Sequence, residues 1–322
     1  MRNDPVEQDP PAPAPALPDS PARTPAAGRV PGRALAILAM IGSAACWGSA
    51  TVMSRDLLYA IPPVTLLVVQ LTASVAFLVV LSAPHVFWRY RSRRFARAAS
   101  IGLLEPGATY TIGLVGLALT TAGSASVIGA SEPVLIPLVA FLIFGHRPSR
   151  RLVACIAVAT LGLVLVSSAS AALPGASPLG DLLIVLATLT AATYVVLSAR
   201  IAGDYPTATL ASGQQAVGLA FGLGAFALVA ATRLDETGLD ALTPGILAYA
   251  ALSGVVQYAL AFWLYLIGLR RFSAGAAGLW LTLIPVFGLL GAWLWLGEVP
   301  TLMTLVGAAM IVAAVTLGRG EE

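Results

Sequence analysis

Apolar residues dominate the chain from residue 34 onward, in long runs separated by short polar or proline-containing breaks. Each run has about 17–24 residues, the length that an α-helix needs to cross a hydrocarbon core of about 30 Å. The period-two alternation that is typical of membrane β-strands is absent from these runs. The pattern therefore predicts an all-α membrane protein with ten transmembrane helices, over residues 34–54, 64–84, 98–118, 124–144, 152–168, 179–199, 210–230, 245–268, 276–296 and 303–318.

The composition supports a lipid environment. Of the 322 residues, 58% are hydrophobic and only 10% are charged, whereas a soluble domain usually carries about a quarter charged residues. Residues 1–33 differ, because they hold nine prolines and almost no bulky apolar side chain. Such a segment cannot bury enough surface to fold, and it lacks the apolar core of a signal peptide. We expect a disordered cytoplasmic tail there.

Basic residues predict the orientation, since they favour the cytoplasmic side of a membrane. All 18 basic residues are arginines. If both termini are cytoplasmic, sixteen arginines fall inside and only Arg55 and Arg233 remain outside. We therefore predict a multi-pass protein of the cell membrane with both termini in the cytoplasm. The net positive charge of the chain is then explained by the arginines of the cytoplasmic segments. It gives no reason to expect a nucleic-acid partner.

The chain also contains an internal repeat. A shift of 152 residues aligns Gly102–Val166 with Gly254–Gly318 without a gap, and sixteen of the 65 positions are identical. The repeating unit is five predicted helices, over residues 34–168 and again over 179–318. An odd number of helices makes the second unit cross the membrane in the opposite sense, and inverted repeats around a midplane site are typical of secondary transporters.

Three stretches carry a resemblance to a known family: "CWGSATVMSR" at 46–55, "EPVLIPLVAFLIFG" at 132–145 and "IPVFGLLGAWLWLGE" at 284–298. In order and spacing they resemble the EamA-type, ten-helix family of the drug/metabolite transporter superfamily. The resemblance implies transport of small molecules through a central cavity. It also implies that the first four helices of each repeat line that cavity and that the fifth and tenth helices are peripheral.

Two acidic residues lie inside the predicted spans, where an ionisable group is costly and usually marks a pathway, a relay or a counter-ion. Glu132 is the ninth residue of segment 124–144, and Glu105 lies in segment 98–118. A rise of 1.5 Å per residue places Glu105 about 10 Å and Glu132 about 20 Å from the cytoplasmic face. We therefore do not expect a direct pair of carboxyl groups, although the two acids could be separate stations along one path. A packing role for Glu132, as a neutral hydrogen-bonding acid, remains open.

Other polar and aromatic residues inside the spans are further candidates for substrate binding. Gln257 is the repeat counterpart of Glu105, and Gln70 lies in segment 64–84; both could instead join neighbouring helices. Five aromatic residues lie well inside their segments, where they could stack on a cationic or ring-bearing substrate or simply pack against other helices: Trp47, Tyr110, Tyr194, Tyr258 and Trp280.

These features predict an exporter of small metabolites such as amino acids that works by alternating access and is either proton-linked or facilitative. A multidrug or organic-cation exporter is the alternative, followed by an intramembrane enzyme or a scaffold. No cofactor is expected because the chain has no nucleotide-binding motif, and its two cysteines and two histidines show no metal-ligand spacing. The sequence leaves open whether two copies form a homodimer.

The topology can be tested by labelling single cysteines with a membrane-impermeant reagent. We expect a cysteine at Asp240 to react from outside intact cells, because its loop is predicted to be external. A cysteine at Arg93 should react only after permeabilisation. The reverse pattern would contradict the arginine-based orientation.

Overall fold

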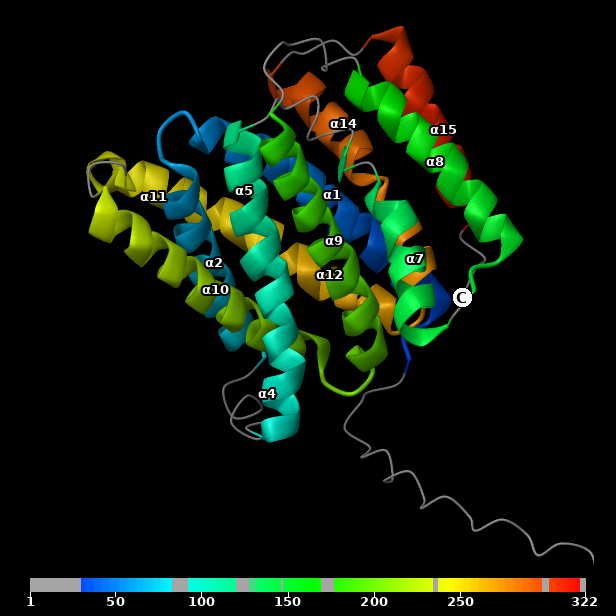
Figure 1. The fold of residues 1–322 in the computed structure, drawn as a ribbon, viewed down its shortest axis with the longest axis horizontal. Coiled ribbons are helices and arrows are strands. Elements are labelled where there is room, and N and C mark those ends of the chain that lie inside the picture. Colours follow the sequence, from blue (N-terminus) through cyan, green and yellow to red (C-terminus); the bar gives the residue numbers. More distant parts are fainter. Residues whose placement is uncertain are drawn as a thin grey trace, which may run out of the picture.

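The computed structural model describes residues 30–82, 92–119, 128–129, 131–145, 147–168, 177–233, 237–296 and 301–318. Most of the predicted tail lies outside these residues, as does the start of segment 124–144. The regular structure in the described ranges is helical, without strands (Figure 1). The helices are α1 (Arg33–Leu57), α2 (Pro63–Leu81), α4 (Arg93–Ala99), α5 (Thr109–Leu119), α7 (Glu132–Phe144), α8 (Arg150–Ser168), α9 (Pro178–Ile201), α10 (Thr207–Thr232), α11 (Pro244–Gly254), α12 (Ala261–Leu269), α13 (Ala274–Leu281), α14 (Ile284–Leu296) and α15 (Leu302–Gly318), with short segments η1 (Ser100–Leu103), η2 (Leu104–Ala108), η4 (Leu239–Ala241) and η5 (Val255–Leu260).

The helical surface suits a bilayer. Six helices, counting α11–α12 as one and α13 with most of α14 as another, are long and apolar enough to cross a membrane. Shorter apolar helices include α7 and α15. Large apolar side chains point outward, with Val80 77% exposed and Leu302 78% exposed. Helices satisfy their own backbone hydrogen bonds, so this apolar exterior can face lipid. The chain is a multi-pass helical membrane protein.

Prolines and capping side chains begin several helices. Pro63, Pro178 and Pro244 stand in the first turns of α2, α9 and α11, where a missing backbone N–H costs nothing and the fixed φ suits a helix. Ser273 begins α13, because its hydroxyl accepts a hydrogen bond from the Ala276 backbone N–H at 3.3 Å. These local signals explain why the observed helices start close to the breaks in the apolar pattern.

Some predicted segments are not continuous helices. Segment 98–118 passes through α4, η1, η2 and α5, and Glu105 has an extended backbone (φ −144°, ψ 126°) inside η2. Segment 276–296 is divided by a turn between α13 and α14. Pro106 and Pro285 follow these breaks and lack the N–H that a continuous helix would use. The expectation of unbroken helices was therefore wrong at both places.

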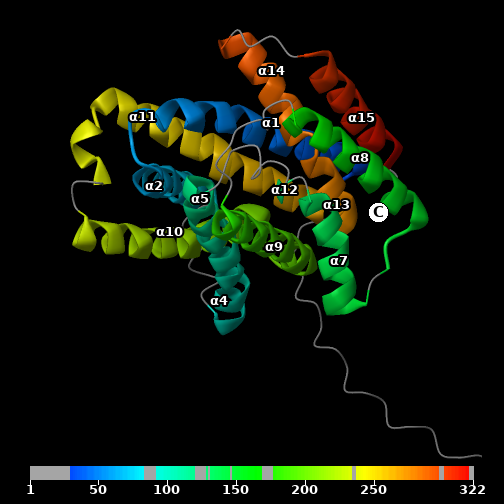
Figure 2. The same ribbon diagram turned by 45° about the horizontal axis from the view of Figure 1, so that its top comes forward.

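Helices α8 and α15 pack against each other at one edge of the bundle (Figures 1 and 2). Gly162 and Gly307 allow the close approach. A Cβ on Gly162 would lie 2.7 Å from the Gly307 carbonyl oxygen, and a Cβ on Gly307 would lie 2.6 Å from that of Gly162. Small residues commonly bring membrane helices together in this way.

The centre of the bundle contains α1, α9 and α12 around a core of aromatic rings. Phe262 and Tyr265 of α12 and Tyr194 of α9 are each about 1% exposed. Gly48 of α1 brings that helix against α14, because a Cβ there would lie 2.6 Å from the Ile284 carbonyl oxygen. These contacts position the helices that surround the candidate site.

Candidate functional site

A cavity of about 200 Å³ lies among the central helices. It receives side chains from α1, the η2–α5 region, α7, α9, the η5–α12 region and the α13–α14 junction. The lining residues are Trp47, Thr51, Glu105, Tyr110, Glu132, Tyr194, Val195, Gln257, Tyr265, Leu281 and Ile284. Glu105 and Glu132, the two acidic candidates from the sequence, therefore line one cavity.

Glu105 reaches the cavity from a break in its helix. Its backbone is extended, and Pro106 follows it. Gln257, the repeat counterpart of Glu105, lies in η5, a widened helical segment like η2. Irregular turns of this kind are frequent at functional sites. The local backbone thus places one polar side chain from each half of the chain against the same cavity.

Glu132 reaches the cavity from the first turn of α7, with Pro133 beside it and Ser131 as the N-cap residue. The positive end of the helix dipole favours a negative charge at this position. The N-terminus of α7 therefore offers Glu132 partial electrostatic compensation inside the bundle. The sequence predicts Glu132 in the middle of a helix over 124–144, whereas α7 begins at this residue.

The separation predicted for the two acids was wrong. Glu105 and Glu132 line the same cavity, and their carboxyl groups are close enough to interact electrostatically. The depth estimate assumed continuous helices rising 1.5 Å per residue. That assumption does not hold, because the helix is broken at Glu105 and α7 starts at Glu132. A pair of carboxyl groups can share one proton or bind one cationic group between them.

Two polar atoms on lining residues have no hydrogen-bond partner among the described residues. They are the indole Nε1 of Trp47 and the hydroxyl of Tyr265, and both atoms are buried. Buried polar groups are normally paired, and leaving one unpaired costs about 1–3 kcal/mol. An indole N–H and a phenol O–H beside two carboxyl groups provide donors for a polar ligand.

Aromatic side chains line the site and pack against further rings behind them. The ring centres of Trp47 and Phe262 are 5.0 Å apart, and those of Trp47 and Tyr265 are 5.5 Å apart, both in edge-on geometry. Tyr110 and Tyr258 are also edge-on, at 5.1 Å. Such contacts fix the rings in place, and their faces can attract a cation.

A chain of hydrogen bonds leads away from the cavity at Gln257. The Ser54 hydroxyl donates to Gln257 Oε1 at 2.7 Å, and Gln70 Nε2 donates to Ser54 Oγ at 2.9 Å and to Ser253 Oγ at 2.8 Å. We call these four residues the Gln70 cluster. It joins α1, α2, α11 and η5.

A second chain of hydrogen bonds leads away from the cavity at Tyr194. The Tyr194 hydroxyl donates to Gln214 Oε1 at 3.0 Å, and Gln214 Nε2 donates to Ser198 Oγ at 3.2 Å and to the Ala98 carbonyl at 3.5 Å. We call these four residues the Gln214 cluster. It joins α4, α9 and α10.

The structure brings together most of the candidate residues. Glu105, Glu132, Gln257, Trp47, Tyr110 and Tyr194 line the cavity. The remaining three lie behind this first layer. Gln70 is 2% exposed within the Gln70 cluster, Tyr258 contacts Tyr110, and Trp280 packs against Phe272 with ring centres 5.9 Å apart. Substrate contact by any of the candidate residues stays a prediction.

Other lining residues were not selected from the sequence: Thr51, Val195, Tyr265, Leu281 and Ile284. Tyr265 lies in the run "AFWLYLIGL" of α12, where no pattern separates a cavity-facing ring from a packed one. Ile284 had a usable signal, because it is the repeat counterpart of Glu132. Within the described ranges, no three His, Cys, Asp or Glu side chains are grouped to hold a metal ion.

Comparison with known families gives a match over residues 34–168 and 178–318 to the EamA-like transporter family. Together these stretches cover most of the chain. The chain belongs to the EamA-like transporter family. This membership confirms the resemblance found in the sequence, and it indicates a transporter rather than an enzyme.

Two curated proteins are similar in sequence. A "Probable terminal-alkyne amino-acid exporter" of Streptantibioticus cattleyicolor is 27% identical over 301 residues, covering 89% of this chain and 96% of its own. The "Uncharacterized transporter YetK" of Bacillus subtilis is 22% identical over 205 residues, covering 63% and 61%. One crystal structure has a TM-score of 0.74 at 21% identity, covering 89% of this transporter and 96% of its own chain, and so shares its fold.

Two tyrosines of this transporter provide a matched test of the site. Tyr194→Phe removes a hydroxyl that bonds Gln214, so it should lower the free energy of unfolding by about 1–2 kcal/mol. Tyr265→Phe removes a buried hydroxyl without a partner among the described residues, so it should leave stability unchanged or raise it. Thermal melting of the purified variants without substrate measures both. An equal loss for Tyr265→Phe would mean that its hydroxyl has a structural role.

Proposed function

We propose that this protein is a secondary active exporter of amino acids or related zwitterions, driven by proton exchange and working by alternating access. The observation that carries the proposal is the shared cavity of Glu105 and Glu132 at the centre of an EamA-family bundle. Paired carboxyl groups suit a substrate ammonium group, and they also suit a proton that the substrate displaces. The name of the Streptantibioticus relative supports an amino-acid substrate.

The size of the cavity favours small metabolites over drug-like cations. At about 200 Å³, it is smaller than the roughly 300–1,000 Å³ of pockets that enclose drug-sized ligands. The Trp47 N–H and the Tyr265 O–H can donate to a substrate carboxylate, a group that an organic cation lacks. The donors and the acids together therefore favour a zwitterion.

We further propose that ten helices form two inverted five-helix repeats. The family match in two stretches supports this division. Irregular segments recur 152 residues apart, with Glu105 in η2 and Gln257 in η5. Helices α7 and α14 begin 152 residues apart, at Glu132 and Ile284, and both have 13 residues.

The side-chain bonds recur as well. Gln70 donates to the serine 16 residues before it, Ser54, and Gln214 donates to the serine 16 residues before it, Ser198. In each case a glycine from another helix packs on the glutamine backbone, Gly254 on Gln70 and Gly102 on Gln214. The duplicated contacts support a two-fold relation between the halves.

These clusters suggest how access alternates. The Gln70 cluster lies toward the C-terminal end of α1, and the Gln214 cluster lies toward the N-terminal end of α10. In the proposed topology these are the external and cytoplasmic sides of the cavity. Opening either side requires separation of the helices that its cluster joins, so exchange of the two repeat conformations would open one side and close the other.

Replacement of Glu132 tests the proposed coupling. Glu132→Gln keeps the shape and hydrogen-bonding capacity of the side chain but cannot bind or release a proton. In proteoliposomes supplied with an amino-acid panel that includes a terminal-alkyne amino acid, we expect the variant to lose uptake driven by a pH gradient and to retain counterflow exchange. Glu132→Ala should impair both, because it also removes the polar contact.

The control is Asp240→Asn, which removes an exposed acid from η4, outside the cavity. It should transport with the pH dependence of the unmodified protein. If Glu132→Gln also keeps that pH dependence, then Glu132 does not couple transport to protons. Measurement of Glu105→Gln would then decide whether Glu105 has this role.

A further inference from the structure

Three pairs of residues that the sequence repeat relates to each other line the central cavity. Two of the pairs are 152 residues apart, and the third pair joins α1 to α9. The shift that relates Gln70 to Gln214 produces this third pair. The pairs are Glu105 with Gln257, Glu132 with Ile284, and Thr51 with Val195. Because both members of each pair face one cavity, the contributions of the two halves of the chain can be compared position by position.

The three pairs differ between the halves in the same direction. The first half contributes two carboxyl groups and the Thr51 hydroxyl, which donates to the Trp47 carbonyl oxygen within α1 at 2.8 Å. With its proton used in that bond, the Thr51 oxygen can only accept from a ligand. At the matching positions the second half contributes an amide and two aliphatic side chains. The cavity is therefore polarised, with acceptors from the first half opposed by mainly apolar groups from the second.

The aliphatic side of the cavity has a third member, Leu281. Leu281 ends α13, three residues before Ile284, and α13 contacts α9, which carries Val195. Ile284 is held against α1, because a Cβ on Gly48 would lie 2.6 Å from its carbonyl oxygen. We call Val195, Leu281 and Ile284 the aliphatic wall. Close packing behind it means that the wall cannot widen freely to admit a larger group.

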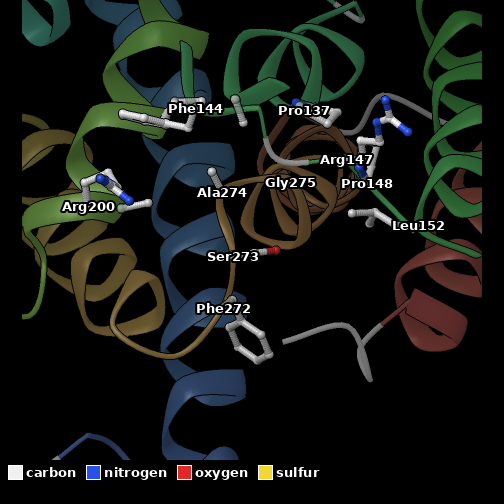
Figure 3. Close-up of a pocket in the computed structure, with 13 residues that line it drawn as sticks. Pro137, Phe144, Arg147, Pro148, Leu152, Arg200, Phe272, Ser273, Ala274 and Gly275 are labelled. Carbon is white, nitrogen blue, oxygen red and sulfur yellow. The ribbon is translucent and has the colours of Figure 1, made fainter. Parts of the chain in front are cut away.

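No arginine is among the described residues that line the central cavity. Arg147 and Arg200 instead stand at opposite edges of a second cavity, of about 270 Å³, beside the C-terminal half of α7 (Figure 3). A substrate carboxylate in the central cavity therefore meets neutral donors, the Trp47 N–H and the Tyr265 O–H. A second carboxylate, on a substrate side chain, would find no counter-ion there.

We propose that the transported amino acid has an uncharged, aliphatic side chain, and that the aliphatic wall determines its size. This inference rests on the proposed function. The substrate ammonium group lies against Glu105, Glu132 and the Thr51 oxygen, and the side chain lies against the aliphatic wall. One space of about 200 Å³ holds both sets of residues, so a ligand that fills it contacts both. A charged side chain would lose its hydration against the wall without gaining a partner, which is costly.

The first test measures size selectivity. Full-length protein in proteoliposomes, without a pH gradient, exchanges labelled norvaline or labelled phenylalanine for the same unlabelled amino acid. Ile284→Ala removes a branched side chain from the aliphatic wall. It should raise the ratio of phenylalanine exchange to norvaline exchange by about tenfold, the scale on which apolar pockets discriminate by size. Ile143→Ala alters an isoleucine of α7 that is 47% exposed and outside the cavity, and it should leave the ratio unchanged.

The second test makes opposite substitutions at two matched positions. Val195→Thr adds a hydroxyl to the aliphatic wall, so the ratio of homoserine exchange to norvaline exchange should rise by about fivefold, the effect of one neutral hydrogen bond. Thr51→Val removes an acceptor for the ammonium group, which both amino acids carry. Both exchange rates should therefore fall while their ratio stays the same.

The unmodified protein should exchange norvaline about tenfold faster than glutamate or lysine. The inference is overturned, with the proposed function intact, if norvaline is exchanged but glutamate and lysine are exchanged equally fast. It is also overturned if Ile284→Ala and Ile143→Ala give the same ratio, or if Val195→Thr and Thr51→Val change the ratio alike. Absence of exchange for every amino acid would contradict the proposed function itself, and the inference with it.

Discussion

The cost of placing carboxyl groups inside a lipid-facing bundle constrains the arrangement of this protein. Charged side chains are expensive at membrane depth unless they face a cavity or a partner. Glu105 and Glu132 meet that condition together, because both line one cavity with hydroxyl, indole and amide groups around it. The surrounding helices bring these groups together, and the apolar exterior isolates them from lipid.

Two interruptions of the helices position the carboxyl groups at the cavity. Glu105 lies at an extended residue within η2, and Glu132 stands at the start of α7. Irregular backbone at membrane depth is tolerated where it is buried in protein or lines a cavity, so these breaks and the polar cavity depend on each other. Behind them, the Gln70 and Gln214 clusters join the helices that surround the cavity.

The membrane class, the helical segments and the family could be predicted from the sequence, because apolar run length, arginine placement and local motifs are properties of the chain itself. That Glu105 and Glu132 lie inside the helical bundle could be predicted for the same reason. Their shared cavity could not, because depth counted along an ideal helix fails where proline breaks the helix. Tyr265 and Thr51 depend on the rotation of α12 and α1, which uniformly apolar surroundings do not specify.

The central claim is that one cavity opens to each side of the membrane in turn. A cysteine at Thr51, which lines the cavity, tests it in a variant lacking Cys46 and Cys155, labelled with a hydrophilic, membrane-impermeant reagent. A cysteine at Val80, on the apolar exterior, is the unreactive control. We expect Thr51→Cys to react from either side of the membrane, with the balance between sides shifting when the pH gradient is reversed. Reaction from one side only under every gradient, or no reaction, would contradict alternating access through this cavity.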